Sequence, residues 1–226
     1  MIESKGWKWN IEFEEKESVW KNPALESYGL MNRWSAQGKK NFLDLGCGLG
    51  RHSMLFGKNG FVVSCFDISQ EALDLTKLWA EAESLSFDYQ CGDMRTLPYK
   101  ENSFDCILGW NVIDHTDTAS VAAVISEIKR VLKSNGECYL TFGSKSAWGW
   151  QQAWPMVDDN TKLRMEEGPE YKVPHFYADK DLLLELFSDF EIIGLTHVED
   201  WGNNNKGVHY HVLVRGRDES INSNDK

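Results

Sequence analysis

The stretch Phe42-Leu43-Asp44-Leu45-Gly46-Cys47-Gly48-Leu49-Gly50-Arg51-His52-Ser53 decides the fold of this chain. An apolar run comes first, three glycines then alternate with other residues, and a helical pattern follows. Glycine permits the positive φ angles that a tight strand-to-helix turn needs, and its missing Cβ lets a ligand approach the backbone. The stretch therefore predicts a buried parallel strand, a turn that binds a nucleotide-like ligand, and a helix.

The glycine spacing narrows the choice of ligand. The dinucleotide fingerprint G-x-G-x-x-G ends in a glycine that lets the helix pack closely on the strand. Here the pattern is G-x-G-x-G, and Arg51 stands where the last dinucleotide glycine would be. With Asp44 just upstream, we interpret the loop as suited to a zwitterion and a nucleoside rather than to a diphosphate.

Composition places the chain among globular proteins and argues against several partners. The 226 residues are 42% hydrophobic, enough for one α/β domain with elaborations. The net charge of −11, with no basic cluster beyond Lys39-Lys40, argues against nucleic acid. No run of residues resembles a membrane span or a signal peptide, so we expect a cytoplasmic protein without a membrane partner. The five cysteines are odd in number and never form C-x-x-C, which indicates reduced, buried thiols.

Strands and helices alternate from residue 41 onward, the pattern of a doubly wound parallel sheet. Ser69 is a candidate N-cap for the second helix, and the polar turn at residues 202–205 predicts an antiparallel pair at the end. We expect strands at 41–45, 61–66, 86–90, 104–108, 137–142, 190–197 and 208–214, and helices at 49–59, after 69, at about 118–133 and at 179–187.

Two segments interrupt this alternation and hold most of the tryptophans. We expect an N-terminal cap segment at 1–40, a domain at 41–215 with an insertion at 143–178 that serves as a substrate cap, and a disordered tail at 216–226. Three prolines in the insertion predict a largely irregular segment. The tryptophans either pack on the sheet or line a cap that holds an apolar or cationic acceptor. Those in the two segments are Trp7, Trp9, Trp20, Trp34, Trp148, Trp150 and Trp154.

Further segments follow at the ends of the predicted strands. Asp67 ends the second strand, Cys91-Gly92-Asp93-Met94 follows the third, and residues 104–111 form the fourth and its exit. Together with the glycine loop, these segments resemble the motifs of the class I S-adenosylmethionine (SAM)-dependent methyltransferases. Residues 131–136 also resemble the family's turn before the fifth strand, with departures at positions 134 and 135. The resemblance covers residues 41–142 strongly, and the last helix and strand pair in topology.

The resemblance implies a Rossmann-like, doubly wound, seven-stranded sheet with its last strand antiparallel and SAM outside the carboxyl ends of the strands. It implies that Asp67 binds the ribose hydroxyls, that Asp93 accepts a hydrogen bond from the adenine amine, and that the ring lies between Ile68 and Met94. NAD enzymes also use an acidic residue at the position of Asp67. The expected cofactor-binding residues are Asp44, Gly46, Cys47, Gly48, Gly50, Asp67, Ile68, Asp93, Met94, Trp110 and Asn111.

Each of these roles has a purely structural alternative. Asp44 suits the ammonium of the methionine part, or it satisfies nearby backbone amides. The alternative for Asp67 and Asp93 is an ordinary acidic residue in a turn, and the alternative for Met94 is a residue of the apolar core. Cys47 is expected to contribute its backbone only.

Candidate catalytic residues follow the fourth strand and lie in the insertion. His115 is a candidate general base, with Asp114 to orient it, and His175 is a second histidine within possible reach of the acceptor. The alternative for His115 is a residue that only shapes the pocket. His209 and His211 lie on one face of a strand, and H-x-H with a third histidine is a possible metal site. A buried, hydrogen-bonded pair is the commoner interpretation, so we expect no metal.

The sequence thus predicts a SAM-dependent methyltransferase that acts on a small molecule. The alternatives are a methyltransferase for protein or RNA, a non-catalytic SAM-binding protein, and an NAD(P)-dependent oxidoreductase. The acceptor molecule, the acceptor atom and the oligomeric state are not readable from the sequence.

Overall fold

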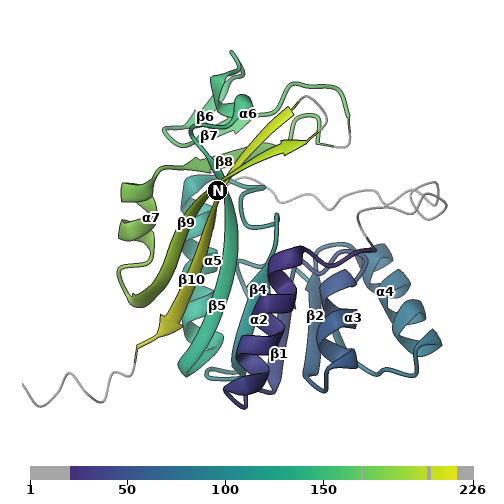
Figure 1. Ribbon diagram of the computed structural model, residues 1–226. Coiled ribbons are helices and arrows are strands. Elements are labelled where there is room, and N and C mark those ends of the chain that lie inside the picture. Colours follow the sequence, from purple (N-terminus) through teal and green to yellow (C-terminus); the bar gives the residue numbers. More distant parts are fainter. Residues whose placement is uncertain (1–20, 169, 203–204, 218–226) are drawn as a thin grey trace, which may run out of the picture.

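The computed structural model describes residues 21–168, 170–202 and 205–217 (Figure 1). The predictions for residues 1–20, for the middle of the turn at 203–204 and for the tail at 218–226 fall outside the described residues. Within the described part of the chain, no helix is both long and apolar enough to cross a membrane.

A parallel sheet in the order β3-β2-β1-β4-β5 forms the first half of the fold. Its carboxyl ends meet at one edge, because Leu45 lies opposite Phe66 and Asp67 lies opposite Cys91. The strands are β1 (Asn41–Leu45), β2 (Val62–Asp67), β3 (Asp88–Cys91), β4 (Phe104–Gly109) and β5 (Leu132–Ser144). The helices between them are α3 (Arg51–Lys58), α4 (Gln70–Ala82) and α5 (Thr118–Val131).

An antiparallel pair completes a seven-stranded sheet, as predicted. After α7 (Lys180–Leu186), strand β9 (Phe190–Gly202) leads to β10 (Asn205–Gly216). Strand β10 pairs antiparallel with both β5 and β9, and Val212 faces Leu140 across the first pair. Both strands are longer than predicted, because their polar ends extend beyond the apolar core that the sequence pattern marks.

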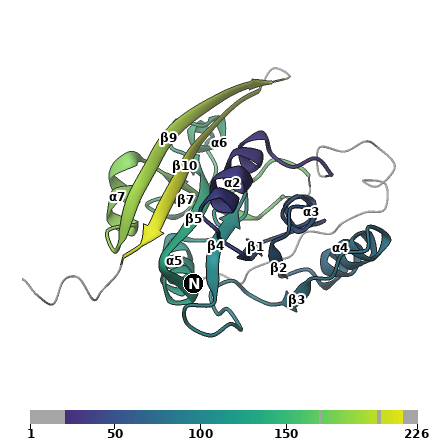
Figure 2. The same cartoon turned by 60° about the horizontal axis from the view of Figure 1, so that its bottom comes forward.

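Helices cover both faces of the sheet, and each face has its own apolar core (Figure 2). Alternation along β1 sends Leu43 toward α5 and α7, and Phe42 toward α3 and α2 (Leu25–Ala36). The predicted cap at Ser69 is confirmed, since its Oγ accepts a hydrogen bond from the amide of Ala72 at 3.2 Å.

Helix α2 is fastened to the sheet by one buried carboxylate, that of Glu137 on β5. Glu137 is 1% exposed and accepts hydrogen bonds from Arg33 at 2.8 Å, Trp34 at 2.9 Å and Arg215 at 3.0 Å. Burial alone would raise the pKa of Glu137, but these hydrogen bonds outweigh it and lower the pKa to about 2. The described part of the N-terminal segment is therefore anchored near the start of β5, away from the carboxyl ends of the strands.

The insertion at 143–178 is more ordered than predicted. Pro155 immediately precedes β6, and Pro174 is the first residue of β8, a position where a missing N–H is tolerated. The prediction of a largely irregular segment holds between β7 and β8 but was wrong around these prolines, because they lie at the starts of strands and not within them. The segment forms α6 (Trp148–Gln151) and three strands, β6 (Met156–Asp158), β7 (Thr161–Leu163) and β8 (Pro174–Ala178). Strand β8 joins the end of β5, so this small sheet stands above the carboxyl ends of the main sheet (Figure 1).

Candidate functional site

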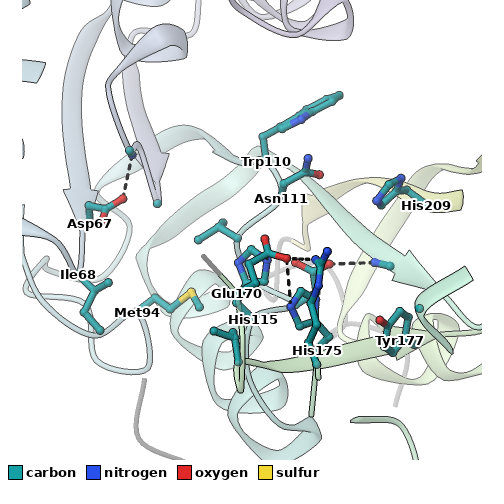
Figure 3. Close-up of a pocket in the computed structure, with 18 of the residues that line it drawn as sticks. Asp67, Ile68, Met94, Trp110, Asn111, His115, Glu170, His175, Tyr177 and His209 are labelled. Carbon is teal, nitrogen blue, oxygen red and sulfur yellow. Dashed lines mark hydrogen bonds and ion pairs between the residues drawn. The ribbon is translucent and has the colours of Figure 1, made fainter. Parts of the chain in front are cut away.

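A cavity of about 500 Å³ opens at the carboxyl ends of the parallel strands. It is lined by the turns after β1, β2, β3 and β4 and by residues of the insertion. Figure 3 shows Asp67, Ile68 and Met94 at one side of the cavity, and His115, Glu170 and His175 gathered apart from them. The predicted strand-end residues and the predicted acceptor residues thus share one cavity.

The glycine loop forms one wall and depends on the absence of side chains. Gly46 has φ 69°, and a Cβ built on it would lie 2.2 Å from Cγ2 of Val112. A Cβ on Gly50 would lie 2.4 Å from Thr76. The amides of Gly46 and Cys47 donate to the carbonyl of Phe66, so the loop folds back on the end of β2.

Gly46→Ala should weaken binding of the expected ligand, SAM, and lower the free energy of unfolding. The new methyl group must displace Val112, and overpacking of this kind costs about 1–3 kcal/mol. Gly60→Ala is the matched control, because Gly60 has φ 80° but no atom within 4 Å of its built Cβ. Urea unfolding and SAM titration of both variants test this. Equal losses in the two variants would show that the φ angle, and not the contact with Val112, restricts position 46.

Asp67 lies at the end of β2 and faces the loop. Its Oδ2 accepts a hydrogen bond from the amide of Gly48 at 2.8 Å (Figure 3). Its Oδ1 accepts one from the amide of Ser69 at 2.9 Å. Burial raises the pKa of Asp67, although the backbone hydrogen bonds oppose this. The carboxylate is held in one orientation at the cavity wall, as an acceptor for two neighbouring hydroxyls requires.

Ile68, Asp93 and Met94 all line the same end of the cavity. Ile68 is 37% exposed, as expected of a side chain that offers an apolar surface to a ligand. Arg95 holds the carboxylate of Asp93 with two hydrogen bonds, at 2.9 and 2.5 Å. Contact of these residues with adenine stays a prediction.

Asp44 and Gly50 are the predicted cofactor residues that do not line the cavity. Asp44 is 1% exposed and accepts a hydrogen bond from Ser53 Oγ at 2.6 Å, while burial raises its pKa to about 6. Its predicted contact with the methionine ammonium stays a prediction. Cys47 lines the cavity, and a hydrogen bond with Cys65 together with burial raises the pKa of its thiol. All five cysteines lie in the described residues and form no disulfide. The prediction of buried thiols is confirmed for four of them and was wrong for Cys91, which is exposed at the end of β3.

The exit of β4 is fixed by β5. Asn111 has φ 50°, donates its amide to Thr141 Oγ1 at 2.8 Å and accepts from the same hydroxyl at 3.0 Å. Trp110 stacks on Tyr139 with 6.1 Å between ring centroids and meets the edge of His211. These contacts hold both predicted residues at the cavity wall.

One part of the cavity brings Asp114, His115 and His175 together, as predicted, and adds two residues that the sequence did not indicate. Nε2 of His115 lies 3.6 Å from Oε1 of Glu170, and Nε2 of His175 lies 3.5 Å from Oε2. Arg164 forms an ion pair with the same Oε2 of Glu170. Arg164 and Glu170 were missed because only the fold of the insertion carries them to this position, and no local pattern marks them.

Two buried atoms here have no hydrogen-bond partner in the structure. They are Nε2 of His175, a residue that is 8% exposed, and Oδ1 of Asp114. The other carboxylate oxygen of Asp114 accepts from the amide of Gly143 at 3.2 Å. Burial, reinforced by the charge of His115, lowers the pKa of His175 to about 3, so this imidazole is neutral at pH 7.

The two histidines of the H-x-H pair have different surroundings. His211 is hydrogen-bonded through Nδ1 to the hydroxyl of Tyr139 at 2.6 Å. This agrees with the interpretation of the pair as buried, hydrogen-bonded histidines. His209 lines the cavity. Neither belongs to the cluster of possible metal ligands found among the described residues, which consists of His115, Glu170 and His175.

The tryptophans of the two aromatic segments divide by role. Trp34 is fully buried against Phe42 and Phe56, which makes it a core residue. Trp148 and Trp154 line the cavity and meet edge to face, 5.5 Å apart. No residue of the described stretch 21–40 lines the cavity, so a cap role of the N-terminal segment stays a prediction for residues 1–20 alone.

Known proteins share this sequence pattern and architecture. Residues 43–140 match the family described as "Methyltransferase domain". The ubiquinone biosynthesis O-methyltransferase of Coxiella burnetii is 29% identical over 195 residues, which are 81% of this chain and 74% of that protein.

Two solved structures of methyltransferases have a similar fold. A SAM-dependent methyltransferase from Methanosarcina mazei has a TM-score of 0.69 and 22% identity, covering 79% of this chain and 93% of that chain. A 1,6-didemethyltoxoflavin-N1-methyltransferase from Burkholderia thailandensis, solved with 1,6-didemethyltoxoflavin and S-adenosylhomocysteine, has a TM-score of 0.65 and 16% identity, covering 92% of this chain and 84% of that chain. These two likenesses show the fold.

Proposed function

Since this chain belongs to the class I SAM-dependent methyltransferases, we propose that it transfers the methyl group of SAM to a small molecule held beneath the insertion. SAM is the cofactor, and the glycine loop with Asp67 and Met94 is the proposed place for it. An NAD(P)-dependent oxidoreductase does not fit a chain of this family, in agreement with Arg51 at the third-glycine position.

The observation that carries the proposal is the continuity of the cavity from the glycine loop to the insertion. Trp148, Trp154 and Tyr177 line the acceptor end together with His115 and His175. Aromatic walls and a polar far end suit a small acceptor with an apolar body and one polar group. The relative from Coxiella burnetii is named as an O-methyltransferase of ubiquinone biosynthesis, which supports a small molecule as the acceptor class.

A macromolecular acceptor is the second candidate, and the observations favour it less. The net charge is −11, and three carboxylates (Asp114, Glu166 and Glu170) line the acceptor end against one arginine, Arg164. Such a wall repels the phosphates of RNA.

The decisive experiment is an acceptor screen that measures release of S-adenosylhomocysteine. Purified protein with SAM is incubated with a panel of small phenols, carboxylic acids, amines and thiols, and in parallel with total RNA and with cell protein. Turnover of one class of small molecule supports the proposal. Turnover of RNA or protein with none of the small molecules would overturn it.

His115→Ala should lower turnover about 100-fold and leave SAM affinity unchanged, because His115 lines the acceptor end and is the proposed proton acceptor. Asp114, predicted to orient it, instead accepts a hydrogen bond from the amide of Gly143, and His175 completes the acceptor wall. His197→Ala is the control, since His197 lies outside the cavity lining and bonds to Ser144. Steady-state kinetics and calorimetry measure the two effects, and an unchanged rate in His115→Ala would remove this residue from the chemistry.

A further inference from the structure

We propose that His115, Glu170 and His175 bind a divalent transition-metal ion at the acceptor end of the cavity. Each residue offers one nitrogen or oxygen as a ligand atom, and these atoms all lie within 4.8 Å of one another (Figure 3). Two histidines and one carboxylate with open positions form a known type of transition-metal site. The sequence analysis expected no metal and considered only the H-x-H pair as its possible core.

The spacing of the donor atoms suits a metal ion. His115 Nε2 lies 3.6 Å from Glu170 Oε1, and His175 Nε2 lies 3.5 Å from Glu170 Oε2. A tetrahedral ion with ligand distances of about 2.1 Å separates its donors by roughly 3.4 Å. Each histidine nitrogen lies near this separation from one oxygen of the carboxylate, and the set with one atom per residue lies within 4.8 Å. The two imidazole rings lie nearly perpendicular, at 77° with 5.0 Å between their centroids, and each offers a nitrogen to the same cluster.

An unpartnered buried atom points to a missing ligand. His175 is 8% exposed, and its Nε2 has no hydrogen-bond partner in the structure. Leaving a buried polar atom unpaired is costly, and a metal ion would satisfy it. His175 lies on β8, where Lys162 of β7 faces it across the ladder, so its backbone position is fixed before any ion binds.

The charges around the three ligands also favour a cation. Asp114, Glu166 and Glu170 contribute three negative charges to this end of the cavity, and Arg164 contributes one positive charge. Arg164 pairs with Glu166 at 2.5 Å and with Oε2 of Glu170, which leaves Oε1 on the side of His115. A divalent ion would balance the remaining two negative charges.

The ligand types select the metal. Imidazole nitrogen suits zinc, iron(II), cobalt(II) and nickel(II), whereas magnesium and calcium prefer sites made only of oxygen. Three protein ligands leave at least one position for a further ligand, as in catalytic zinc sites. That position opens into the cavity that the acceptor shares.

The consequence for the acceptor rests on the proposed function. An acceptor hydroxyl bound to the ion loses its proton to water more readily, because the metal lowers the pKa of a bound hydroxyl. The resulting oxygen anion forms a bond to the methyl carbon as the S–C bond of SAM breaks, and sulfur keeps that electron pair. The acceptor class would then be a hydroxylated molecule. In this state His115 is a metal ligand and not a proton acceptor.

Metal binding can be measured without methyl transfer. Chelator-treated full-length protein is titrated by calorimetry with Zn²⁺, with Mg²⁺ as a negative probe, and Co²⁺ binding is followed by its visible absorption. We expect micromolar or tighter Zn²⁺ affinity. His175→Ala and Glu170→Gln should each weaken it at least about 100-fold. His209→Ala is the matched control, since His209 lines the same cavity outside the cluster, and it should keep the wild-type affinity.

SAM titration of the same samples separates the possible failures. A wild-type protein that binds SAM but neither Zn²⁺ nor Co²⁺ overturns the metal site and leaves the proposed function standing. If His209→Ala weakens Zn²⁺ binding as much as His175→Ala does, the ion binds elsewhere, and the proposed metal site is also overturned. Once an acceptor is known, its turnover is measured with and without bound Zn²⁺. Turnover that is unchanged without Zn²⁺ would contradict the proposal that the metal binds the acceptor. Loss of turnover while SAM still binds would support that proposal.

Discussion

Asp67→Ala is expected to weaken SAM binding roughly 1,000-fold. The side chain stands at the end of β2 in the cavity wall, where the carboxylate is the proposed acceptor for both ribose hydroxyls. Two hydrogen bonds to a charged group contribute about 4 kcal/mol together, which corresponds to this loss of affinity. Calorimetric titration with SAM and with S-adenosylhomocysteine measures it.

Two further variants separate ligand contact from loop structure. Asp67→Asn keeps an oxygen that accepts from the amide of Gly48 or Ser69, so it should retain the folded loop and still lose most of the affinity. Asp88→Ala removes an exposed carboxylate from the neighbouring strand β3 and should change nothing. A loss of less than tenfold in Asp67→Ala would contradict the ribose assignment.

Glu137→Ala is expected to lower the free energy of unfolding by about 3–5 kcal/mol, the cost of breaking a buried ion pair by removing one partner. Arg33, Trp34 and Arg215 all donate to this carboxylate, and the indole of Trp34 is fully buried. Urea denaturation measures the loss. The matched control is Glu191→Ala, since Glu191 pairs with Arg215 at the exposed end of the same network.

The same network predicts a pH dependence of stability. The pKa of Glu137 is lowered from 4.5 to about 2 in the folded protein, so the folded state prefers the ionised form. Its contribution is complete above pH 4.5 and is lost as the pH falls from about 4.5 to about 2. Glu137→Gln should flatten the stability curve in this window. If Glu137→Gln and the wild-type protein lose stability equally between pH 4.5 and pH 2, the pH dependence does not come from Glu137.

The cofactor end of the cavity could be predicted from the sequence because its signals are local. Gly46 and Gly48 mark a strand-to-helix turn with positive φ angles, and Asp67 ends an apolar strand. In a parallel sheet the carboxyl ends of neighbouring strands meet at one edge. Local order along the chain therefore determines which residues converge.

The acceptor end could not be predicted in the same way. His175 and Glu170 lie in a segment whose three prolines suggested irregular structure, and they meet His115 only because β8 joins the end of β5. Composition did not separate Trp34, a core residue, from Trp148, a cavity residue. The role of each tryptophan depends on the surface that its own segment packs against, and the local sequence does not contain that information.

By itself, then, the sequence determined the alternation of strands and helices, the glycine turn and the acidic strand end that suit SAM, because short-range backbone and side-chain preferences encode them. Only the tertiary structure decided that Glu137 ties α2 to the sheet and that Glu170 stands between His115 and His175. The physical reason is that these contacts join segments distant in the chain. Their energies depend on burial and distance, which exist only once the insertion and the N-terminal helix have packed on the sheet.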